Sequence, residues 1–209
     1  MIQPGFQIRR ARPGDEPAAY GVCLETGDGG RGAGHLYDDP EALGHIYVGP
    51  YLKLEPELAF LLEDARGVCG YVLGALDSRV FYSRYENAWL PGIRGSHPEP
   101  AGDPARWTKT ERLYYEYYHP DLFCPEPYAE YPSHLHIDLV PRAQGRGLGL
   151  EMMKVLLDKL RAAGSPGVHL GMHASNARAE RFYKRMGFHE LVRDDKDSLY
   201  LGKRLAAGK

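Results

Sequence analysis

The chain has 209 residues, of which 43% are hydrophobic and 26% are charged, and its formal net charge at pH 7 is -2. This length suits one domain, expected over residues 1–209, and the small net charge argues against nucleic acid or an anionic membrane as a partner. We expect a cytoplasmic protein for three reasons: its three cysteines are widely spaced, residues 1–6 lack a signal-peptide pattern, and no apolar run is long enough to span a membrane.

The N-terminal third of the chain indicates a strand, a helix, a loop and a hairpin. Residues 6–10 are predicted to form an edge strand, followed by a helix that begins at Asp15, whose side chain can cap it. The glycine-rich stretch 27–34 is predicted to be a loop. The apolar runs 59–63 and 70–76 flank a short turn and predict two antiparallel strands.

Residues 77–133 differ in character from the rest, because they are rich in proline and contain both tryptophans. We expect a long insertion whose one clear helix spans about 108–118, and which forms the substrate-side subregion. Its large aromatic side chains either line a pocket or only pack the insertion onto the sheet. The aromatic candidates are Tyr82, Tyr85, Trp89, Trp107, Tyr114 and Tyr118, with Asp121, Glu126 and Glu130 placed to attract a cation.

A strand is predicted over 134–140, with apolar and titratable side chains on opposite faces. Leu135, Ile137 and Leu139 alternate there with His134, His136 and Asp138. The remaining elements are predicted as a helix over 147–163, a strand over 168–173, a helix over 177–186, and closing strands over 188–192 and 198–205.

The strongest chemical signal is the run Gln144-Gly145-Arg146-Gly147-Leu148-Gly149, which lies between a predicted strand and a predicted helix. Glycines let successive backbone N–H groups converge, and a helix N-terminus adds a positive dipole end, so the pattern predicts a pyrophosphate site. The G-x-G-x-G spacing departs from the dinucleotide fingerprint, and no lysine with serine or threonine follows as in an ATP-binding loop. The alternative is a glycine-rich helix entrance that binds nothing.

Two ordered motifs resemble those of the GNAT N-acetyltransferase superfamily. The first comprises Leu139, Pro141, Gln144, Gly145, Gly147 and Gly149, and the second comprises Asn176, Ala179, Tyr183, Gly187 and Phe188. Further stretches, including residues 47–52, 62–64, 68–74 and 89–91, are similar to the acetyltransferase-like C-terminal domain of animal O-GlcNAcases and its free-standing bacterial relatives. No glycosidase barrel fits in this length, so the resemblance extends to the acyltransferase-like domain alone.

The resemblance implies an α+β fold with a mixed central sheet, splayed fourth and fifth strands, flanking helices, and a long insertion between the third and fourth strands. It also implies direct acetyl transfer from acetyl-CoA to a primary amine on a small molecule, a peptide or a protein lysine. A backbone N–H near Leu139 or Val140 would then bind the thioester oxygen. The implied cofactor-binding residues are Leu139, Val140, Gln144, Gly145, Arg146, Gly147, Leu148, Gly149, Asn176 and Tyr183.

Two of these residues have simpler alternatives. Tyr183 is implied as the proton donor to the leaving thiolate, but its spacing also suits a buried aromatic residue of a helix. Asn176 is implied to contact the pantetheine arm, and asparagine is equally a favoured helix N-cap.

For the catalytic base we favour Asp138, which shares a strand face with His136 and precedes the thioester-binding position. His136 and His134 are rivals, although a strand histidine is more often structural. Alternate positions on one strand rarely complete a metal shell, so we expect no metal there. The alternative to an enzyme is a non-catalytic module with the same fold that binds acetyl-CoA or a peptide.

Overall fold

A computed structural model of the chain describes residues 3–194 and 197–205. Met1 and Ile2, which begin the segment without a signal-peptide pattern, lie outside the described residues. Among the helices that the structure describes, none is long and apolar enough to cross a membrane.

Seven strands form one mixed sheet in the order β1-β2-β3-β4-β5-β7-β6. Neighbouring strands run antiparallel except β4 and β5, which are parallel. The predicted α+β class and mixed sheet are therefore confirmed. The strands are β1 (Gln7–Arg10), β2 (Ala59–Asp64), β3 (Gly67–Ala75), β4 (Ser133–Leu139), β5 (Gly167–His173), β6 (His189–Arg193) and β7 (Ser198–Arg204).

The parallel contact between β4 and β5 is short. Only Ser133 with Val168 and His134 with His169 are paired between them, after which the described strands diverge. The predicted splay is thus confirmed. Parallel neighbours need a crossover, and α7 (Leu148–Ala162) supplies it.

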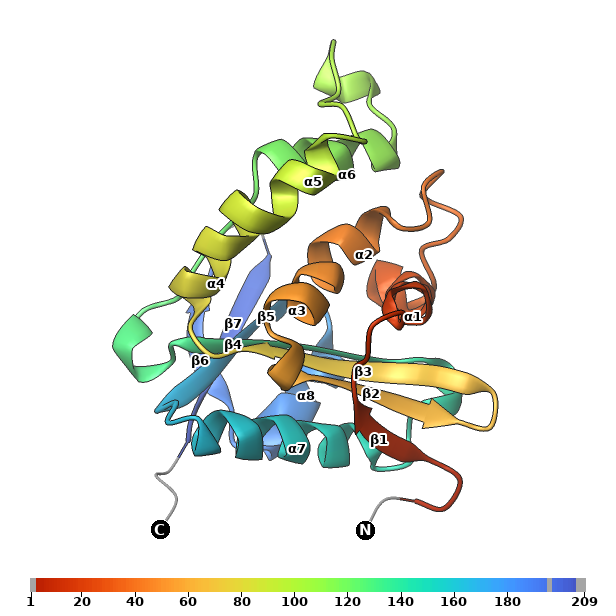
Figure 1. Cartoon of the computed structure of the whole chain (residues 1–209). Coiled ribbons are helices and arrows are strands. Elements are labelled where there is room, and N and C mark those ends of the chain that lie inside the picture. The colour runs from red at the N-terminus through yellow and green to blue at the C-terminus, as the bar shows by residue number, and fades with distance from the viewer. Residues whose placement is uncertain (1–2, 195–196, 206–209) are drawn as a thin grey trace.

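One face of the sheet is covered by α7 (Figure 1), which contacts β2, β3 and β4. Met152, Leu156 and Leu160 are fully buried on the sheet-facing side of this helix, and each such side chain contributes about 1.5–3 kcal/mol. The helix approaches so closely that a Cβ atom on Gly74 would lie 2.8 Å from the Leu156 Cδ1 atom.

The opposite face is covered by α1 (Glu16–Gly30), α2 (Ala42–Tyr47) and α3 (Gly49–Leu54) (Figure 1). The backbone of α1 leaves helical dihedral angles over residues 27–29, so the loop predicted at the glycines is confirmed. The two six-residue helices were not predicted, because neither is long enough to show a helical period.

The predicted capping role of Asp15 is wrong. Its carboxylate accepts from the Arg9 guanidinium at 2.7 and 2.9 Å and from the Arg12 backbone N–H at 2.6 Å, and it caps no helical N–H. A bidentate, charge-assisted pair is stronger than a bond to a helix N–H, so the arginine takes the carboxylate.

The insertion between β3 and β4 is more helical than expected. The predicted helix is α6 (Lys109–Tyr118), with Thr108 and Glu111 forming a capping box. A second helical run was missed: α4 (Ser78–Arg84), a π-helical turn (Tyr85–Trp89) and α5 (Leu90–Arg94). Asp77 caps this run, and the π-helical turn precedes Pro91, which has no backbone N–H to donate to the preceding turn.

The last helix, α8 (Ala177–Arg185), lies beside the N-terminus of α7. A Cβ atom on Gly149 would meet the ring of Phe182 at 3.6 Å, an ordinary packing distance. The short 3-10 helices are Pro56–Leu58, Pro104–Arg106, Tyr128–Glu130 and Pro141–Ala143.

Candidate functional site

The glycine-rich loop between β4 and α7 presents a row of unpaired backbone donors. Among the described residues, no acceptor takes a hydrogen bond from the backbone N–H groups of residues 145–149. Gly145 and Gly147 adopt left-handed φ angles of 72° and 76°, which few other residues tolerate. Because these groups lie at a helix N-terminus, the loop is suited to bind an anionic phosphate group.

Side chains hold this loop against the sheet. The Gln144 amide donates to the Leu139 carbonyl oxygen at 2.7 Å, which ties the start of the loop to the end of β4. Arg146 is exposed at the loop surface, and its guanidinium Nε donates to the Arg142 carbonyl oxygen at 3.1 Å. The Leu148 side chain is 1% exposed and anchors the helix start in the core, so its N–H group and not its side chain faces a ligand.

Of the two backbone N–H groups expected to bind the thioester oxygen, that of Val140 is paired within the sheet and that of Leu139 is not. The Val140 N–H donates to the Cys69 carbonyl oxygen at 3.0 Å, so its predicted role toward a ligand is wrong. Successive N–H groups of a strand point to opposite edges, so the Leu139 N–H faces the side of β5, where ladder pairing has already stopped. Leu139 therefore supplies the available donor.

On α8, the Asn176 side chain accepts from the Ala179 N–H at 3.1 Å, which confirms its capping role. The Tyr183 ring is 9% exposed and packs edge-on against Phe182 and Phe188. Its hydroxyl has no hydrogen-bond partner among the described residues. Burial, with a smaller contribution from the Asp138 charge, raises the Tyr183 pKa, so the hydroxyl keeps its proton at neutral pH.

Asp138 lies within a three-membered polar cluster on the β4 face that α1 covers. The Tyr71 hydroxyl donates to Asp138 Oδ2 at 2.6 Å, and His136 Nε2 lies 2.9 Å from the Tyr71 oxygen and 3.1 Å from Asp138 Oδ2. The tyrosine proton is given to the carboxylate, so the imidazole N–H is shared between the two oxygens. Of the three residues that sequence alternation placed on one face, His136 and Asp138 are joined through Tyr71 of β3, whereas His134 bonds Ser78 instead.

The two strand histidines differ in charge because only one has a carboxylate neighbour. Burial by itself lowers the pKa of His136, but the Asp138 charge and hydrogen bond raise it from 6.5 to about 10. Burial, with His169 as a smaller factor, lowers the pKa of His134 well below its usual value. At neutral pH His136 is therefore an imidazolium and His134 is neutral.

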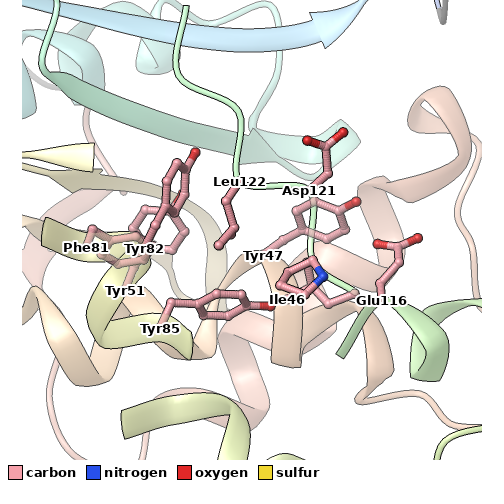
Figure 2. A pocket seen from close by; sticks show the side chains of 10 residues that line it. Ile46, Tyr47, Tyr51, Phe81, Tyr82, Tyr85, Glu116, Asp121 and Leu122 are labelled. Carbon is pink, nitrogen blue, oxygen red and sulfur yellow. The ribbon is translucent and has the colours of Figure 1, made fainter. Parts of the chain in front are cut away.

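A pocket lies over this face of β4. Tyr51, Phe81 and Tyr82 line it and pack on the ring of His134, while Tyr47 packs on the ring of His136 at 5.8 Å. Figure 2 shows the carboxyl groups of Glu116 and Asp121 at the same end of the pocket as Tyr47, with Phe81 and Tyr82 at the other end. Aromatic walls with acidic groups at one end are suited to bind a cation.

Glu116 is the acidic residue of this pocket that sequence reasoning missed. Burial, with Asp121 as a smaller factor, raises its pKa. No described basic side chain forms an ion pair with it. Its helical spacing in α6 gives no hint of this role, because only the fold brings it to Tyr47.

Each of the two alternatives for the insertion's aromatic residues holds for part of the set. Tyr82 and Tyr85 line the pocket, and so does Asp121. The other aromatic residues have packing roles. Trp107 and Tyr118 bond carbonyl oxygens within the insertion, those of Ala101 and of Arg94 and His97. Trp89 and Tyr114 tie the insertion to the α2 region through the His45 carbonyl oxygen and Asp39. Glu126 and Glu130 lie outside the pocket and pair with Arg79 and Arg204.

Comparison with known proteins gives one family match. The family model described as "Acetyltransferase (GNAT) family" matches residues 109–188. Protein O-GlcNAcase of Rattus norvegicus is 29% identical over 204 residues, which cover 96% of this chain. The chain spans 22% of the length of that relative.

Solved structures agree with this match. SsHAT is 40% identical with a TM-score of 0.89, and the match covers 97% of this chain and 100% of that chain. The structure of yncA from Salmonella typhimurium with its cofactor acetyl-CoA is 15% identical with a TM-score of 0.57, covering 98% of this chain and 96% of that one, and shows a shared fold.

The charge state of His136 can be tested by following its imidazole resonances by NMR against pH. We expect His136 to stay protonated from pH 6.5 until about pH 10, and to lose its proton at much lower pH in Asp138→Asn, where burial is no longer offset. The interaction of protonated His136 with Asp138 contributes fully to the free energy of unfolding below pH 6.5, and this contribution is lost as the pH rises through 10. The free energy of unfolding should therefore fall more over that window in the wild-type protein than in the variant.

His169 provides the internal control, because burial lowers its pKa and it bonds the Tyr131 carbonyl oxygen. Its titration should not respond to the Asp138 substitution. An ordinary His136 titration near pH 6.5 in the wild-type protein would contradict the charge assignment.

Proposed function

Because this chain belongs to the acetyltransferase (GNAT) family, we propose that it transfers an acetyl group from acetyl-CoA directly to a primary amine. The observation that supports binding of acetyl-CoA is the row of backbone N–H groups over residues 145–149, which have no acceptor among the described residues. In this proposal residues 1–209 act as one catalytic unit, and the insertion 77–133 forms its acceptor side.

The loop would hold the pyrophosphate of acetyl-CoA through these N–H groups, with the α7 N-terminus adding its dipole. Gln144 would keep the loop in register with β4 through its bond to Leu139. Asn176 would fix the start of α8 beside the pantetheine arm. That arm would run along the edge of β4, beyond the last residue that pairs with β5.

The transfer needs one bond formed and one broken. The amine nitrogen attacks the thioester carbonyl carbon, the carbon–sulfur bond breaks, and the products are an amide and the free thiol of CoA. The Leu139 N–H would stabilise the negative charge on the carbonyl oxygen. Tyr183 would give its proton to the leaving sulfur, and the attacking nitrogen would lose its proton to Asp138.

Asp138 is the best base among the three titratable residues of β4. His136 is already protonated at neutral pH, so it has no free lone pair for the incoming amine. His134 is neutral but 4% exposed, with Nδ1 bonded to the Ser78 hydroxyl at 2.7 Å. His136 is therefore assigned to positioning the carboxylate, and His134 to the floor of the pocket.

The acceptor would carry positive charge beyond the reacting amine, as a diamine or a basic peptide does. Glu116 and Asp121 would bind the second cation in the pocket, and Tyr47 would guide the chain past His136 toward Asp138. Aromatic faces at Tyr82 and Tyr85 would pack on the methylene groups of the acceptor or attract its charge.

A second candidate is a non-catalytic module that binds acetyl-CoA and a cationic peptide. One observation favours it: Asp138 Oδ2 already accepts from the Tyr71 hydroxyl and lies 3.1 Å from His136 Nε2, so this oxygen already has two protein partners. The two functions differ in turnover and not in binding.

The phosphate assignment is tested by Gly147→Glu, with acetyl-CoA affinity measured by isothermal titration. We expect the loss to be roughly 100-fold or more, or about 2.8 kcal/mol, because the carboxylate enters the anion site. Gly164→Glu is a matched control, since that exposed glycine has a φ of 86° at the other end of α7. Equal affinity losses in both variants would mean that the loop does not bind phosphate.

The catalytic assignment is tested by Asp138→Asn and Tyr183→Phe, with steady-state rates measured on the amine that wild type acetylates best. Each variant should lower kcat by roughly 10²- to 10⁴-fold while the Kd for acetyl-CoA stays unchanged. Tyr128→Phe removes a tyrosine hydroxyl from Asp77 outside this site and should keep full activity. Wild-type turnover in Asp138→Asn would remove Asp138 from the mechanism, and wild-type protein that binds acetyl-CoA but turns over no amine would support the module.

The acceptor pocket is tested by Glu116→Gln, comparing a diamine with a monoamine of similar length. The KM for the diamine should rise about tenfold, as expected for one lost charge pair in a half-buried site, while the KM for the monoamine changes little. Glu126→Gln is the control, because that exposed acid pairs with Arg79 outside the pocket. An equal response to both amines would contradict the cation site without affecting the acetyl-CoA assignment.

A further inference from the structure

We propose that Asp39, His45 and His97 form a zinc-binding site, separate from the acetyl-transfer site. Each offers one ligand atom, and these atoms lie within 4.8 Å of one another. The ligands come from the turn before α2, from α2 itself and from the residues that follow α5. The cluster therefore lies where the insertion meets the helices over the sheet.

Hydrogen bonds on the far side of each ring orient the two imidazoles for metal binding. His97 Nδ1 lies 2.8 Å from the Ile93 carbonyl oxygen, which can only accept, so Nδ1 carries the proton and Nε2 has the lone pair. His45 Nδ1 lies 3.3 Å from the Tyr117 hydroxyl, whose own proton goes to the Ala42 carbonyl oxygen. His45 is therefore also protonated on Nδ1, and its Nε2 is free to bind a metal.

These second bonds are the outer-shell contacts that metal-binding histidines usually have. The Asp39 carboxylate also has such supporting hydrogen bonds. Asp39 accepts from the Tyr114 hydroxyl at 2.9 Å through Oδ2 and from the Glu41 N–H at 2.9 Å through Oδ1, which fix its orientation.

The separation of Asp39 and His97 suits two ligands of one ion better than a direct hydrogen bond. Asp39 Oδ2 and His97 Nε2 are 3.5 Å apart, beyond the usual range for an N–H···O bond. Two ligands at about 2.1 Å from a tetrahedral centre lie about 3.4 Å apart. His45 would supply the third ligand, since its ligand atom lies within 4.8 Å of the other two, and water would take the fourth position.

The ligand set selects the metal. Two imidazole nitrogens and one carboxylate oxygen suit zinc or a similar transition ion, whereas calcium and magnesium prefer oxygen ligands alone. The site is mostly buried but accessible, because the Asp39 and His97 side chains are 20% and 17% exposed. A bound ion would tie the end of α5 to α2 and so fix the insertion over the sheet.

The test uses the full-length chain, first freed of metal with a chelator and then titrated with zinc chloride. We expect one zinc ion per chain by isothermal titration and a rise in Tm of about 5 °C or more at saturation, because zinc binds the folded state selectively. Cobalt in place of zinc should give the visible absorption bands of a tetrahedral N/O site.

His97→Gln and Asp39→Asn should each weaken zinc binding at least tenfold and abolish the Tm rise. The metal-free Tm of each variant is measured first, so that a folding defect is not mistaken for lost binding. His119→Gln is the control, because that half-exposed histidine pairs with Glu99 outside the cluster and should leave zinc binding unchanged. Absence of zinc binding in wild type, or equal binding in His97→Gln, would overturn the proposal.

Discussion

The early end of pairing between β4 and β5 is the constraint on which the site depends. A parallel pair requires a helical crossover, so α7 begins beside the edge that the diverging strands expose. The same break leaves the Leu139 N–H unpaired and sets it near the N–H groups of residues 145–149. The N–H groups of residues 145–147 are exposed beside a helix N-terminus, an arrangement suited to bind an anionic ligand.

The two faces of β4 have different roles. Its apolar side chains meet α7, while His134, His136 and Asp138 face the helices of the other layer. The two histidines show how strongly surroundings decide charge: burial acts on both, but only His136 lies beside a carboxylate and stays protonated. With about a third of each side chain of the His136–Asp138 pair exposed, solvent weakens this coupling without removing it.

The sequence predicts the elements that have a clear period or a motif. The alternation over 134–140, the glycine loop before α7 and the helix after Asn176 all lie where expected, because local pattern and tertiary contacts agree. The prediction that Asp15 caps a helix is wrong because Arg9, which β1 places nearby, pairs with its carboxylate. Tyr71 and Glu116 could not be predicted as site residues. Tyr71 reaches the site through the pairing of β3 with β4, and Glu116 through the packing of the insertion, and no local sequence pattern indicates either contact.

The proposed metal cluster and the proposed acceptor pocket share their supporting helices. In α2, His45 belongs to the cluster and the adjacent Ile46 and Tyr47 line the pocket. In α6, Tyr117 bonds His45 while its neighbour Glu116 faces the pocket. Consecutive helical residues point about 100° apart, so the same two turns carry both sets of side chains. An ion that fixes His45 against His97 would therefore also fix the distance between Tyr47 and Glu116, and with it the width of the end of the pocket where the cation is proposed to bind.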